Sequence, residues 1–291
     1  MAEVPSGRDL LQETFLTRID TPPGRSSQES RPFHTASSMM TDESVRKRRD
    51  RFPRGLTQPE KGYRFGADPL LLASYVWPRS GESVLDLGTG CGVAGLALLL
   101  RNPGVSVTGV DISADMIECA RANAALLGLQ DRFFPHCLDV LDLRRAPEIR
   151  AEAFDRVILN PPYRRPGHGR EPLDTNRRES RFEHLATLQD FLQAGAYGLK
   201  NRGLLTLVHL GARLGSVFQA AASVRLEVQR MRCVHSSQLS GARLVLIQAR
   251  KNGKPGLEID PPLVLHERSH DGQSRMSRQA LEFCPFLGCN P

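Results

Sequence analysis

The sequence predicts an α/β fold in which helices cover both faces of a mostly parallel sheet that ends in an antiparallel hairpin. From residue 69 to residue 223, short apolar runs typical of buried strands alternate with longer stretches of helical periodicity. This alternation builds a parallel sheet, because each strand returns through a helix to lie beside another strand. The last two apolar runs are instead joined by the short loop 236–241, whose serines and glycine favour a hairpin. The sequence therefore predicts seven strands in one sheet.

The predicted elements follow from these patterns in chain order. The first helix begins near Asp68, which we expect to act as its N-cap, because Asp is favoured there and Pro69 fits the first turn. Gly128 stops the helix that follows the second strand. Predicted strands occupy residues 83–87, 105–110, 133–138, 154–159, 203–210, 225–234 and 242–250. Predicted helices occupy residues 69–77, 93–100, 114–127, 185–199 and 212–223.

The N-terminal region differs in composition from the rest of the chain. Residues 1–54 are rich in Ser, Arg and Pro and lack sustained periodicity, so we expect a disordered extension, with a short helix at 9–19. Met39 and Met40 lie near its end, and one hypothesis is that translation starts there. The basic run 46–51 is typical of a solvated tail; its functional alternative is a sequence-independent contact with phosphates.

One domain is expected between the two ends of the chain. Residues 55–267 carry all the predicted strands, and residues 268–291 are expected to form a polar tail. The apolar segment 283–287 within that tail is expected to dock on the domain. The chain thus predicts one catalytic or binding domain with two extensions.

Composition limits the class of protein. The formal net charge is +7 and the pI about 9.4, which suits a polyanionic partner such as nucleic acid. The alternative is a protein that is simply basic. The six cysteines contain no C-x-x-C pair, which indicates free thiols in a reducing compartment. No apolar run approaches the ~20 residues of a membrane span, and the N-terminus lacks the apolar core of a signal peptide. We therefore expect a soluble cytoplasmic protein.

A metal site is not expected. Cys284 and Cys289 follow His266 and His270, but their spacing matches no structural zinc pattern. The sequence thus predicts chemistry that does not depend on a bound metal.

The stretch Asn160-Pro161-Pro162-Tyr163 directly follows the predicted strand 154–159. Two consecutive prolines cannot donate to a ladder, so the strand must end there, at an edge where ligands bind in open α/β sheets. The Asn160 side-chain oxygen and the Pro161 carbonyl can accept the two hydrogens of an –NH2 group. The Tyr163 ring can stack on the plane that carries this group, with Pro162 beside it. The alternative is a turn that merely ends a strand.

The glycine-rich stretch Gly90-Cys-Gly92-Val-Ala-Gly95 fits the G-x-G-x-x-G fingerprint, with Asp111 about twenty residues further on. The pattern predicts a dinucleotide site, but S-adenosylmethionine carries the same ribose without a pyrophosphate. Asp86 and Gly88 favour S-adenosylmethionine, because a carboxylate there disfavours a pyrophosphate and suits a cationic amino acid.

Further residues at the predicted strand ends complete the expected cofactor site. Asp139 can accept from the adenine amine or cap a helix, and the Asp68 carboxylate can accept from the cofactor ammonium group. The residues expected to contact the cofactor are Asp68, Asp86, Gly88, Gly90, Gly92, Asp111, Ile112, Asp139, Val140 and Asn160.

A long polar loop follows the Asn-Pro-Pro-Tyr stretch. Residues 164–184 hold six arginines against four acids, and long loops in compact domains are usually functional or disordered. We expect the loop to clamp substrate phosphates, which positions a nucleic acid without specifying its sequence. A solvated loop without such a role is the alternative. The residues expected to bind substrate are Pro162, Tyr163, Arg164, Arg165, Arg177, Arg178 and Arg181.

Together these motifs resemble the Rossmann-like class I S-adenosylmethionine-dependent methyltransferases that act on amino or amide nitrogen. Among them, the chain is similar to the bacterial tRNA (adenine-N6)-methyltransferases that modify the adenosine just 3′ of the anticodon in a valine tRNA. The resemblance covers about residues 56–287. Its carriers are residues 64–72, 84–92, 160–163 and 177–184.

This resemblance implies a catalytic role for Asn160, Pro161 and Tyr163, S-adenosylmethionine as cofactor, and the anticodon loop of a tRNA as substrate. The adenine amine is a poor nucleophile because its lone pair is delocalised into the ring. Two acceptors that hold its hydrogens draw the nitrogen toward tetrahedral geometry, so positioning supplies most of the rate gain. We expect a monomer.

Three other functions fit parts of the sequence. Another RNA or DNA amino-methyltransferase would share the Asn160-Pro161-Pro162-Tyr163 stretch. A protein glutamine-N5 methyltransferase acting on release factors would meet the same –NH2 group, but residues 1–54 do not form the apolar helical domain that those enzymes use. A non-catalytic RNA-binding module would keep the fold without the chemistry, and the intact glycine loop and Asn160-Pro161-Pro162-Tyr163 argue against it.

Overall fold

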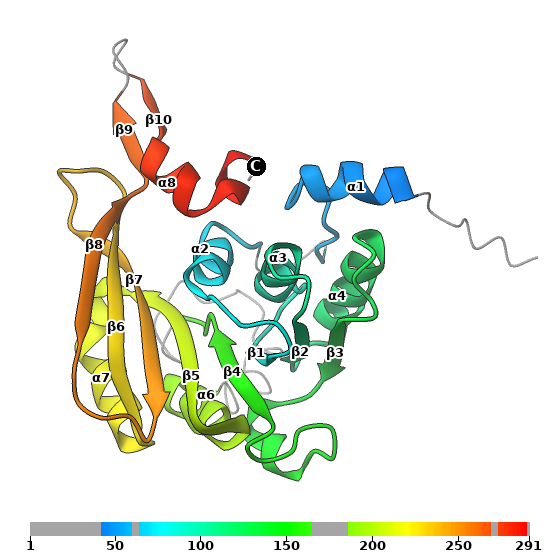
Figure 1. Ribbon diagram of the computed structural model, residues 1–291, viewed down its shortest axis with the longest axis vertical. Helices are drawn as coiled ribbons and strands as arrows, with labels where there is room; N and C mark the ends of the chain where they lie inside the picture. The colour runs from blue at the N-terminus through cyan, green and yellow to red at the C-terminus, as the bar shows by residue number, and fades with distance from the viewer. Residues whose placement is uncertain (1–41, 60–63, 164–185, 269–272, 290–291) are drawn as a thin grey trace, which may run out of the picture. The chain divides into compact units, whose positions relative to one another are not determined.

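The computed structural model describes residues 42–59, 64–163, 186–268 and 273–289 (Figure 1). Its centre is an eight-stranded sheet in the order β3-β2-β1-β4-β5-β7-β6-β8. All neighbouring strands pair in parallel except β7, which is antiparallel to both β5 and β6. The predicted α/β fold, a mostly parallel sheet with an antiparallel hairpin, is confirmed, and the sheet has one strand more than the predicted seven.

The elements have the following bounds. The strands of the main sheet are β1 Ser83–Leu87, β2 Ser106–Asp111, β3 Phe133–Cys137, β4 Phe154–Leu159, β5 Leu199–Leu210, β6 Leu226–His235, β7 Ala242–Lys251 and β8 Glu258–Val264. A small antiparallel sheet contains β9 His266–Arg268 and β10 Ser274–Met276. The α-helices are α1 Asp42–Asp50, α2 Asp68–Tyr75, α3 Val93–Arg101, α4 Ala114–Leu126, α6 Leu188–Gly198, α7 Leu214–Ser223 and α8 Arg278–Phe283. The short 3-10 helices are η1 Val140–Arg145, η3 Gly211–Arg213 and η4 Pro285–Cys289.

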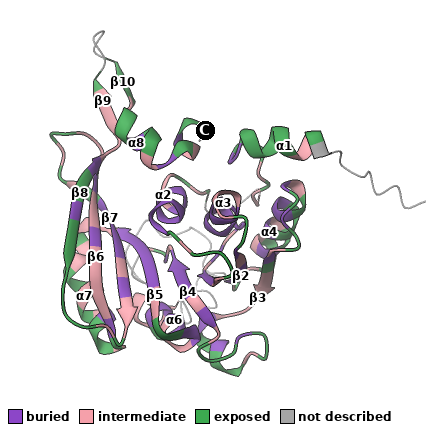
Figure 2. Cartoon of the chain, in the orientation of Figure 1, coloured by how far each residue is buried: buried purple, intermediate pink, exposed green. Residues whose placement is uncertain are grey.

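Two hydrophobic cores lie on the two faces of the main sheet. Val84 and Ile158 pack into the core that contains α2, α3 and α4, whereas their neighbours Leu85 and Val157 pack into the core that contains α6 and α7. Successive side chains of a strand point to opposite faces, so a strand covered on both sides needs a continuous apolar run. Figure 2 shows the buried residues along the central strands. The apolar runs that predict the strands therefore fill both cores.

Strand β5 begins earlier than the sequence predicts. It starts at Leu199, directly after α6, instead of at residue 203. Phe154 pairs with Leu199 and Arg156 pairs with Leu204, so the residues between them form a bulge, with Arg202 at a φ of 67°. A bulge and a turn need the same backbone freedom, so residues 200–203 have the composition of a turn. The sequence pattern therefore places the start of the strand after them.

Strand β8 is absent from the prediction because it contains Pro261 and Pro262. It lies at the edge of the sheet and pairs only with β6, where a missing N–H is tolerated. The register shifts opposite the prolines. The neighbouring Asp260 carboxylate accepts bonds from Tyr75 Oη at 2.7 Å and Arg230 Nη2 at 2.7 Å. Contacts with α2 and β6, which sequence pattern does not reveal, thus hold this strand in place.

The expected disorder of residues 1–54 is wrong for residues 42–54. Helix α1 is held by Arg49, whose Nε donates to the Leu127 carbonyl at 2.8 Å, at the end of α4. Phe52 is buried, and its ring meets Phe286 edge-on with centroids 5.0 Å apart. Composition cannot report such tertiary contacts. The predicted helix at 9–19 and the hypothesis of a start at Met39 or Met40 lie outside the described residues.

The C-terminal segment packs on the same side of the main sheet as α2. Ala280 and Cys284 are fully buried, and the Cys284 thiol donates to the Leu70 carbonyl at 3.5 Å. Within the described ranges no helix has the length and apolar character to cross a bilayer.

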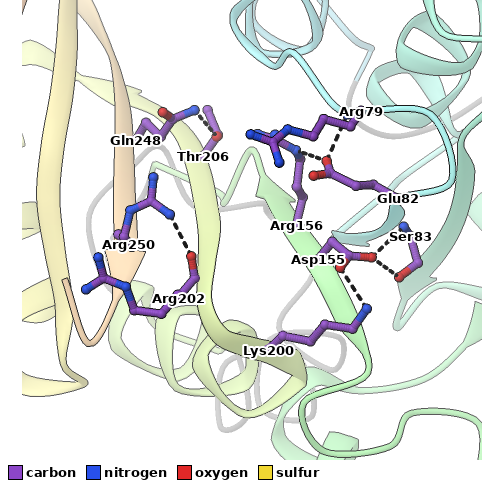
Figure 3. A network of polar contacts seen from close by, with 10 residues as sticks. All are labelled: Arg79, Glu82, Ser83, Asp155, Arg156, Lys200, Arg202, Thr206, Gln248 and Arg250. Carbon is purple, nitrogen blue, oxygen red and sulfur yellow. Dashed lines mark hydrogen bonds and ion pairs between the residues drawn. The ribbon is translucent and has the colours of Figure 1, made fainter.

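A polar network ties the amino ends of β1, β4 and β5 together (Figure 3). The Asp155 carboxylate accepts bonds from the Ser83 backbone N–H and hydroxyl, both at 3.0 Å, and from Lys200 Nζ at 2.7 Å. Arg156 donates from Nε to the Glu82 carboxylate beside it. This network lies at the opposite edge of the sheet from the Asn-Pro-Pro-Tyr stretch, which follows the carboxyl end of β4.

Candidate functional site

The loops that carry the predicted motifs leave the same edge of the main sheet. Leu87, the last residue of β1, pairs with Val110 of β2 and with Leu159, the last residue of β4. Leu159 in turn pairs with Leu207 of β5. The loops at 88–92, 111–113 and 160–163 therefore start side by side, at the carboxyl edge where open α/β sheets bind ligands.

The glycine loop, residues 88–92, is held in a conformation that suits glycine. Gly88, Gly90 and Gly92 have φ values of 70°, 55° and 88°, in the left-handed region. The Gly90 N–H donates to Asp111 Oδ2 at 2.8 Å, and Asp111 Oδ1 accepts the Ser113 N–H at 2.9 Å. A Cβ at Gly90 would meet nothing within 4 Å, so the loop has open space where a ligand could approach its backbone.

Gly95 performs a different task from the glycines of the loop. A Cβ there would lie 2.7 Å from the Phe133 ring and 3.0 Å from Val107, so its absence lets α3 approach the sheet. Gly90 and Gly92 of the fingerprint thus allow the shape of the loop, whereas Gly95 allows the close packing of the helix that follows it.

Asp86 lies buried beneath the glycine loop. Its Oδ2 accepts the Thr89 hydroxyl at 2.7 Å and the Gly95 N–H at 3.2 Å. Burial raises the pKa of Asp86 to about 7, although these two hydrogen bonds oppose the shift. The carboxyl group therefore holds the loop to α3, and a cation nearby would favour its ionised form.

Tyr163 links Asn160 to Asp68. Its hydroxyl oxygen lies 2.7 Å from Asp68 Oδ2 and 2.9 Å from Asn160 Oδ1. A phenol has one proton, which it donates to one of these two acceptor oxygens at a time. The contact holds the Asn160 amide beside Tyr163, and Oδ1 keeps a second lone pair that can accept a hydrogen from a ligand.

Asp68 does not cap α2. The N-cap is Ala67, without a side-chain hydrogen bond, and Asp68 is the first helical residue. The expected N-cap is therefore wrong, because Tyr163 engages the Asp68 carboxylate instead. A negative charge in the first turn still suits the helix dipole.

The remaining residues of the Asn-Pro-Pro-Tyr stretch differ in exposure. Pro161 is buried and Pro162 is exposed. The predicted substrate-binding residues Arg164, Arg165, Arg177, Arg178 and Arg181 lie outside the described residues.

Three predicted cofactor residues lie beyond the ends of β2 and β3. Ile112 exposes 61 % of its surface although it is apolar, and it directly follows Asp111. Asp139 accepts the Leu141 N–H at 2.9 Å and so caps η1, which is one of the two roles expected for it. Val140, the first residue of η1, is buried. Ile112 therefore offers an exposed apolar surface for a flat ligand, next to Asp111, whose carboxylate is bonded to the glycine loop.

His209 joins this site although the motifs do not include it. It lies near the end of β5 with 5 % of its surface exposed, and its ring meets Tyr163 edge-on at 5.3 Å between centroids. Burial lowers its pKa, so the imidazole is neutral at physiological pH. Its Nδ1 has no hydrogen-bond partner among the described residues. The sequence signal that could have indicated His209 is a single polar residue near the carboxyl end of an otherwise apolar strand.

A metal centre finds no support in the part of the chain that the structure describes. There, no group of three or more His, Cys, Asp or Glu side chains is placed to hold a metal ion. All six cysteines are free thiols.

A glycine loop after β1 and an Asn-Pro-Pro-Tyr stretch after β4, on one edge of this sheet, define a Rossmann-like group-transfer enzyme. The chain belongs to the methyltransferase small domain family, whose model matches residues 66–214. It is thus a methyltransferase.

Named relatives agree with this family, and a solved structure shares the fold. The chain is 31% identical over 172 residues to the tRNA1(Val) (adenine(37)-N6)-methyltransferase of Porphyromonas gingivalis. The matched segment covers 58% of this chain and 67% of that relative. It is 39% identical over 93 residues to the release factor glutamine methyltransferase of Chlorobaculum tepidum, covering 32% of this chain and 31% of that relative. A crystal structure of a predicted O-methyltransferase from Agrobacterium tumefaciens has the same fold, with a TM-score of 0.61 and 24% identity over 75% of this chain and 96% of that chain.

Proposed function

We propose that this methyltransferase transfers a methyl group from S-adenosylmethionine to N6 of an adenosine in tRNA, in the anticodon loop. The observation that carries the proposal is the Tyr163–Asn160 contact, which holds the Asn160 amide at the carboxyl edge of the sheet, close to the glycine loop, with a second lone pair of Oδ1 left to accept. The named relative from Porphyromonas gingivalis, a tRNA adenine-N6 methyltransferase, supports the choice of substrate.

The cofactor site that we propose fits the described residues. Gly88, Gly90 and Gly92 let the loop backbone pass close to the ligand, and the space at Gly90 is open. Asp111 can accept from ribose hydroxyls as well as from the loop, since a carboxylate has about four acceptor positions. When bound, S-adenosylmethionine supplies an activated methyl group on a sulfonium.

The adenine end of the cofactor would lie over the ends of β2 and β3. We assign its apolar contacts to Ile112 and Val140, and its amine to Asp139. Asp86 and Asp68 contribute negative charge near the methionine part, which is cationic.

The chemistry assigned to the protein is positioning. Asn160 Oδ1 and the Pro161 carbonyl accept the two hydrogens of the adenine amine, which draws the nitrogen toward tetrahedral geometry and reduces the delocalisation of its lone pair into the ring. The Tyr163 ring stacks on the adenine, with Pro162 beside it. Because both acceptors act on hydrogens that the nitrogen already carries, no strong general base is needed before methyl transfer.

The target base must leave its stack to reach these groups, and a flexible anticodon loop allows this at lower cost than a duplex. In this proposal the enzyme acts as a cytoplasmic monomer. The arginines of the loop after Tyr163 hold the tRNA backbone. These are Arg164, Arg165, Arg177, Arg178 and Arg181.

Incubation with tritiated S-adenosylmethionine tests the proposal. Total tRNA and a purified release factor are supplied in separate reactions, and the labelled tRNA is digested for nucleoside mass spectrometry. We expect label in tRNA as N6-methyladenosine and none in the release factor. Label only in a glutamine of the release factor would instead establish the second candidate, which the similarity to release factor glutamine methyltransferases favours.

A further inference from the structure

A pocket of about 320 Å³ lies beside Asp68, between the start of α2 and the hairpin of β6 and β7. Arg64 and Asp68 line it from one side, and Arg243 at the start of β7 lines it from the other. Val234 and Leu244 contribute apolar walls. We call it the Arg64–Arg243 pocket. Of its lining residues, only Asp68 has a role assigned above.

The pocket carries an excess of positive charge. Arg64 and Arg243 are both exposed, and within the described ranges neither forms an ion pair or hydrogen bond. Asp68 is the acid in the lining, and its Oδ2 already accepts the Tyr163 hydroxyl. Some of the described arginines do pair with an acid, as Arg230 does with Asp260. Two unpaired guanidinium groups facing one pocket are suited to a phosphate, which arginine binds through paired N–H donors.

The walls of the pocket indicate more than a free ion. Beside the arginines, its lining includes aliphatic side chains and Ser236, whose carbonyl is fixed by His266 Nδ1 at 3.2 Å. An apolar wall next to two cations matches a ribose or base attached to a phosphate, because each part of a nucleotide then finds a suitable surface.

Asp68 connects the pocket to the methyl-accepting group. The same carboxylate lines the pocket and holds Tyr163, which contacts Asn160. A ligand in the pocket and the target amine would therefore both lie near Asp68 and Tyr163, which suits two parts of one RNA strand.

We propose that the Arg64–Arg243 pocket binds the sugar-phosphate of the RNA nucleotide that flanks the methylated adenosine. This inference rests on the proposed function and names a second RNA contact of that same site. The pocket contributes to RNA affinity and to the placement of the strand, whereas Asn160 and its neighbours act on the amine.

The test measures binding separately from methyl transfer. Fluorescence anisotropy follows a labelled RNA hairpin with an adenosine-containing single-stranded loop, at several salt concentrations, with wild type and with Arg64→Ala/Arg243→Ala. The matched control is Arg150→Ala, an exposed arginine without an ion pair among the described residues, four positions before the amino end of β4. Thermal melting checks that all three proteins are folded.

We expect the double variant to bind the hairpin at least about 10-fold more weakly, or about 1.4 kcal/mol, because two charged contacts with phosphate are lost. The slope of log K against log salt should fall by about 1.4, since each contact with a single-stranded phosphate contributes about 0.7. Arg243→Lys should restore part of the affinity. Arg150→Ala should behave as wild type.

Equal losses of RNA affinity in the double variant and in Arg150→Ala would overturn the proposed binding role of the pocket, because the effect would then be one of net charge alone. Methylation of the hairpin distinguishes this outcome from failure of the proposed function. If wild type methylates the hairpin but the double variant binds it normally, only the pocket is wrong. If wild type binds the hairpin through these arginines and transfers no methyl to it, the adenosine methylation is wrong and the phosphate site stands.

Discussion

The two edges of the main sheet treat their polar groups in opposite ways. At the amino edge, Asp155 is bonded to Ser83 and Lys200, and Glu82 is paired with Arg156 (Figure 3). At the carboxyl edge, His209 Nδ1 is buried without a partner in the described part of the chain. Among the described residues, the acids of the amino edge are paired within the chain, and the carboxyl edge keeps one imidazole nitrogen that a ligand or water can satisfy.

This difference has an energetic meaning. A buried polar atom without a partner costs about 1–3 kcal/mol, which a fold does not recover unless a ligand or water bonds to it. Unfinished bonding at the carboxyl edge therefore indicates where ligands complete the structure, whereas the amino edge stabilises the chain. Changes at the two edges should accordingly separate activity from stability.

The two aspartates Asp86 and Asp155 express the same contrast. Burial raises the pKa of Asp86, near the carboxyl edge, to about 7. Burial also works to raise the pKa of Asp155, but the bonds from Lys200 and Ser83 outweigh it, so this pKa lies below its ordinary value of 3.8. A raised pKa opposes ionisation in the folded protein, and a lowered one favours it.

The largest effect is expected from Asn160→Ala, at the carboxyl edge. It removes one of the two acceptors assigned to the amine, so turnover should fall at least about 1,000-fold, or roughly 4 kcal/mol in the barrier. Cofactor binding, measured by calorimetry, should change little, and the unfolding free energy should stay close to that of wild type. Near-normal turnover would remove Asn160 from the mechanism and end the contrast between the edges.

The second effect is the pH dependence of stability from Asp86. Its folded pKa is about 7 against an ordinary value of 3.8, so its stabilising contribution is fully present below pH 3.8 and is lost as pH rises through 7. Asp86→Asn keeps an oxygen for Thr89 and Gly95 but cannot ionise. Between pH 4 and pH 8, the stability of the variant should gain on wild type by up to about 4 kcal/mol.

Urea unfolding across that pH range measures the gain, and Asp155→Asn is the matched control. The Asp155 pKa is lowered, so its contribution is present above 3.8 and is lost as pH falls through the folded value. In acid, the unfolding free energy of wild type should therefore fall relative to that of Asp155→Asn. This direction is opposite to the one expected for Asp86→Asn. Parallel pH profiles for the two variants would contradict the opposite pKa shifts of Asp86 and Asp155.

Sequence reasoning succeeded where a motif is local. The glycine loop and the Asn-Pro-Pro-Tyr stretch each lie within a few residues of a strand end, and strand order then brings them together. It missed the contact between Tyr163 and Asp68, which are 95 positions apart, and it missed His209 and the Arg64–Arg243 pocket. These depend on how β5, β7 and the start of α2 pack, which no short pattern encodes.

The third effect is a loss of stability at the amino edge. Asp155→Ala removes three hydrogen bonds to a partly buried carboxylate and leaves Lys200 without its acid, so the unfolding free energy should fall by about 2–3 kcal/mol. Turnover per folded molecule should be unchanged, because the network lies at the other edge of the sheet. Chemical denaturation with steady-state rates on the same samples measures both, and a loss of kcat without a loss of stability would reverse the roles of the edges.

The smallest effect is expected from Tyr163→Phe. The ring is kept for stacking, but the hydroxyl bridge between Asp68 and Asn160 Oδ1 is lost, so the Asn160 amide is no longer held in place. A hydrogen bond of about 1–2 kcal/mol corresponds to a fall in single-turnover rate of roughly 5- to 30-fold. Tyr197→Phe, on α6, is the matched control and should leave the rate unchanged. If Tyr163→Phe is as fast as wild type, the bridge does not orient the amide, and the carboxyl edge depends on Asn160 alone.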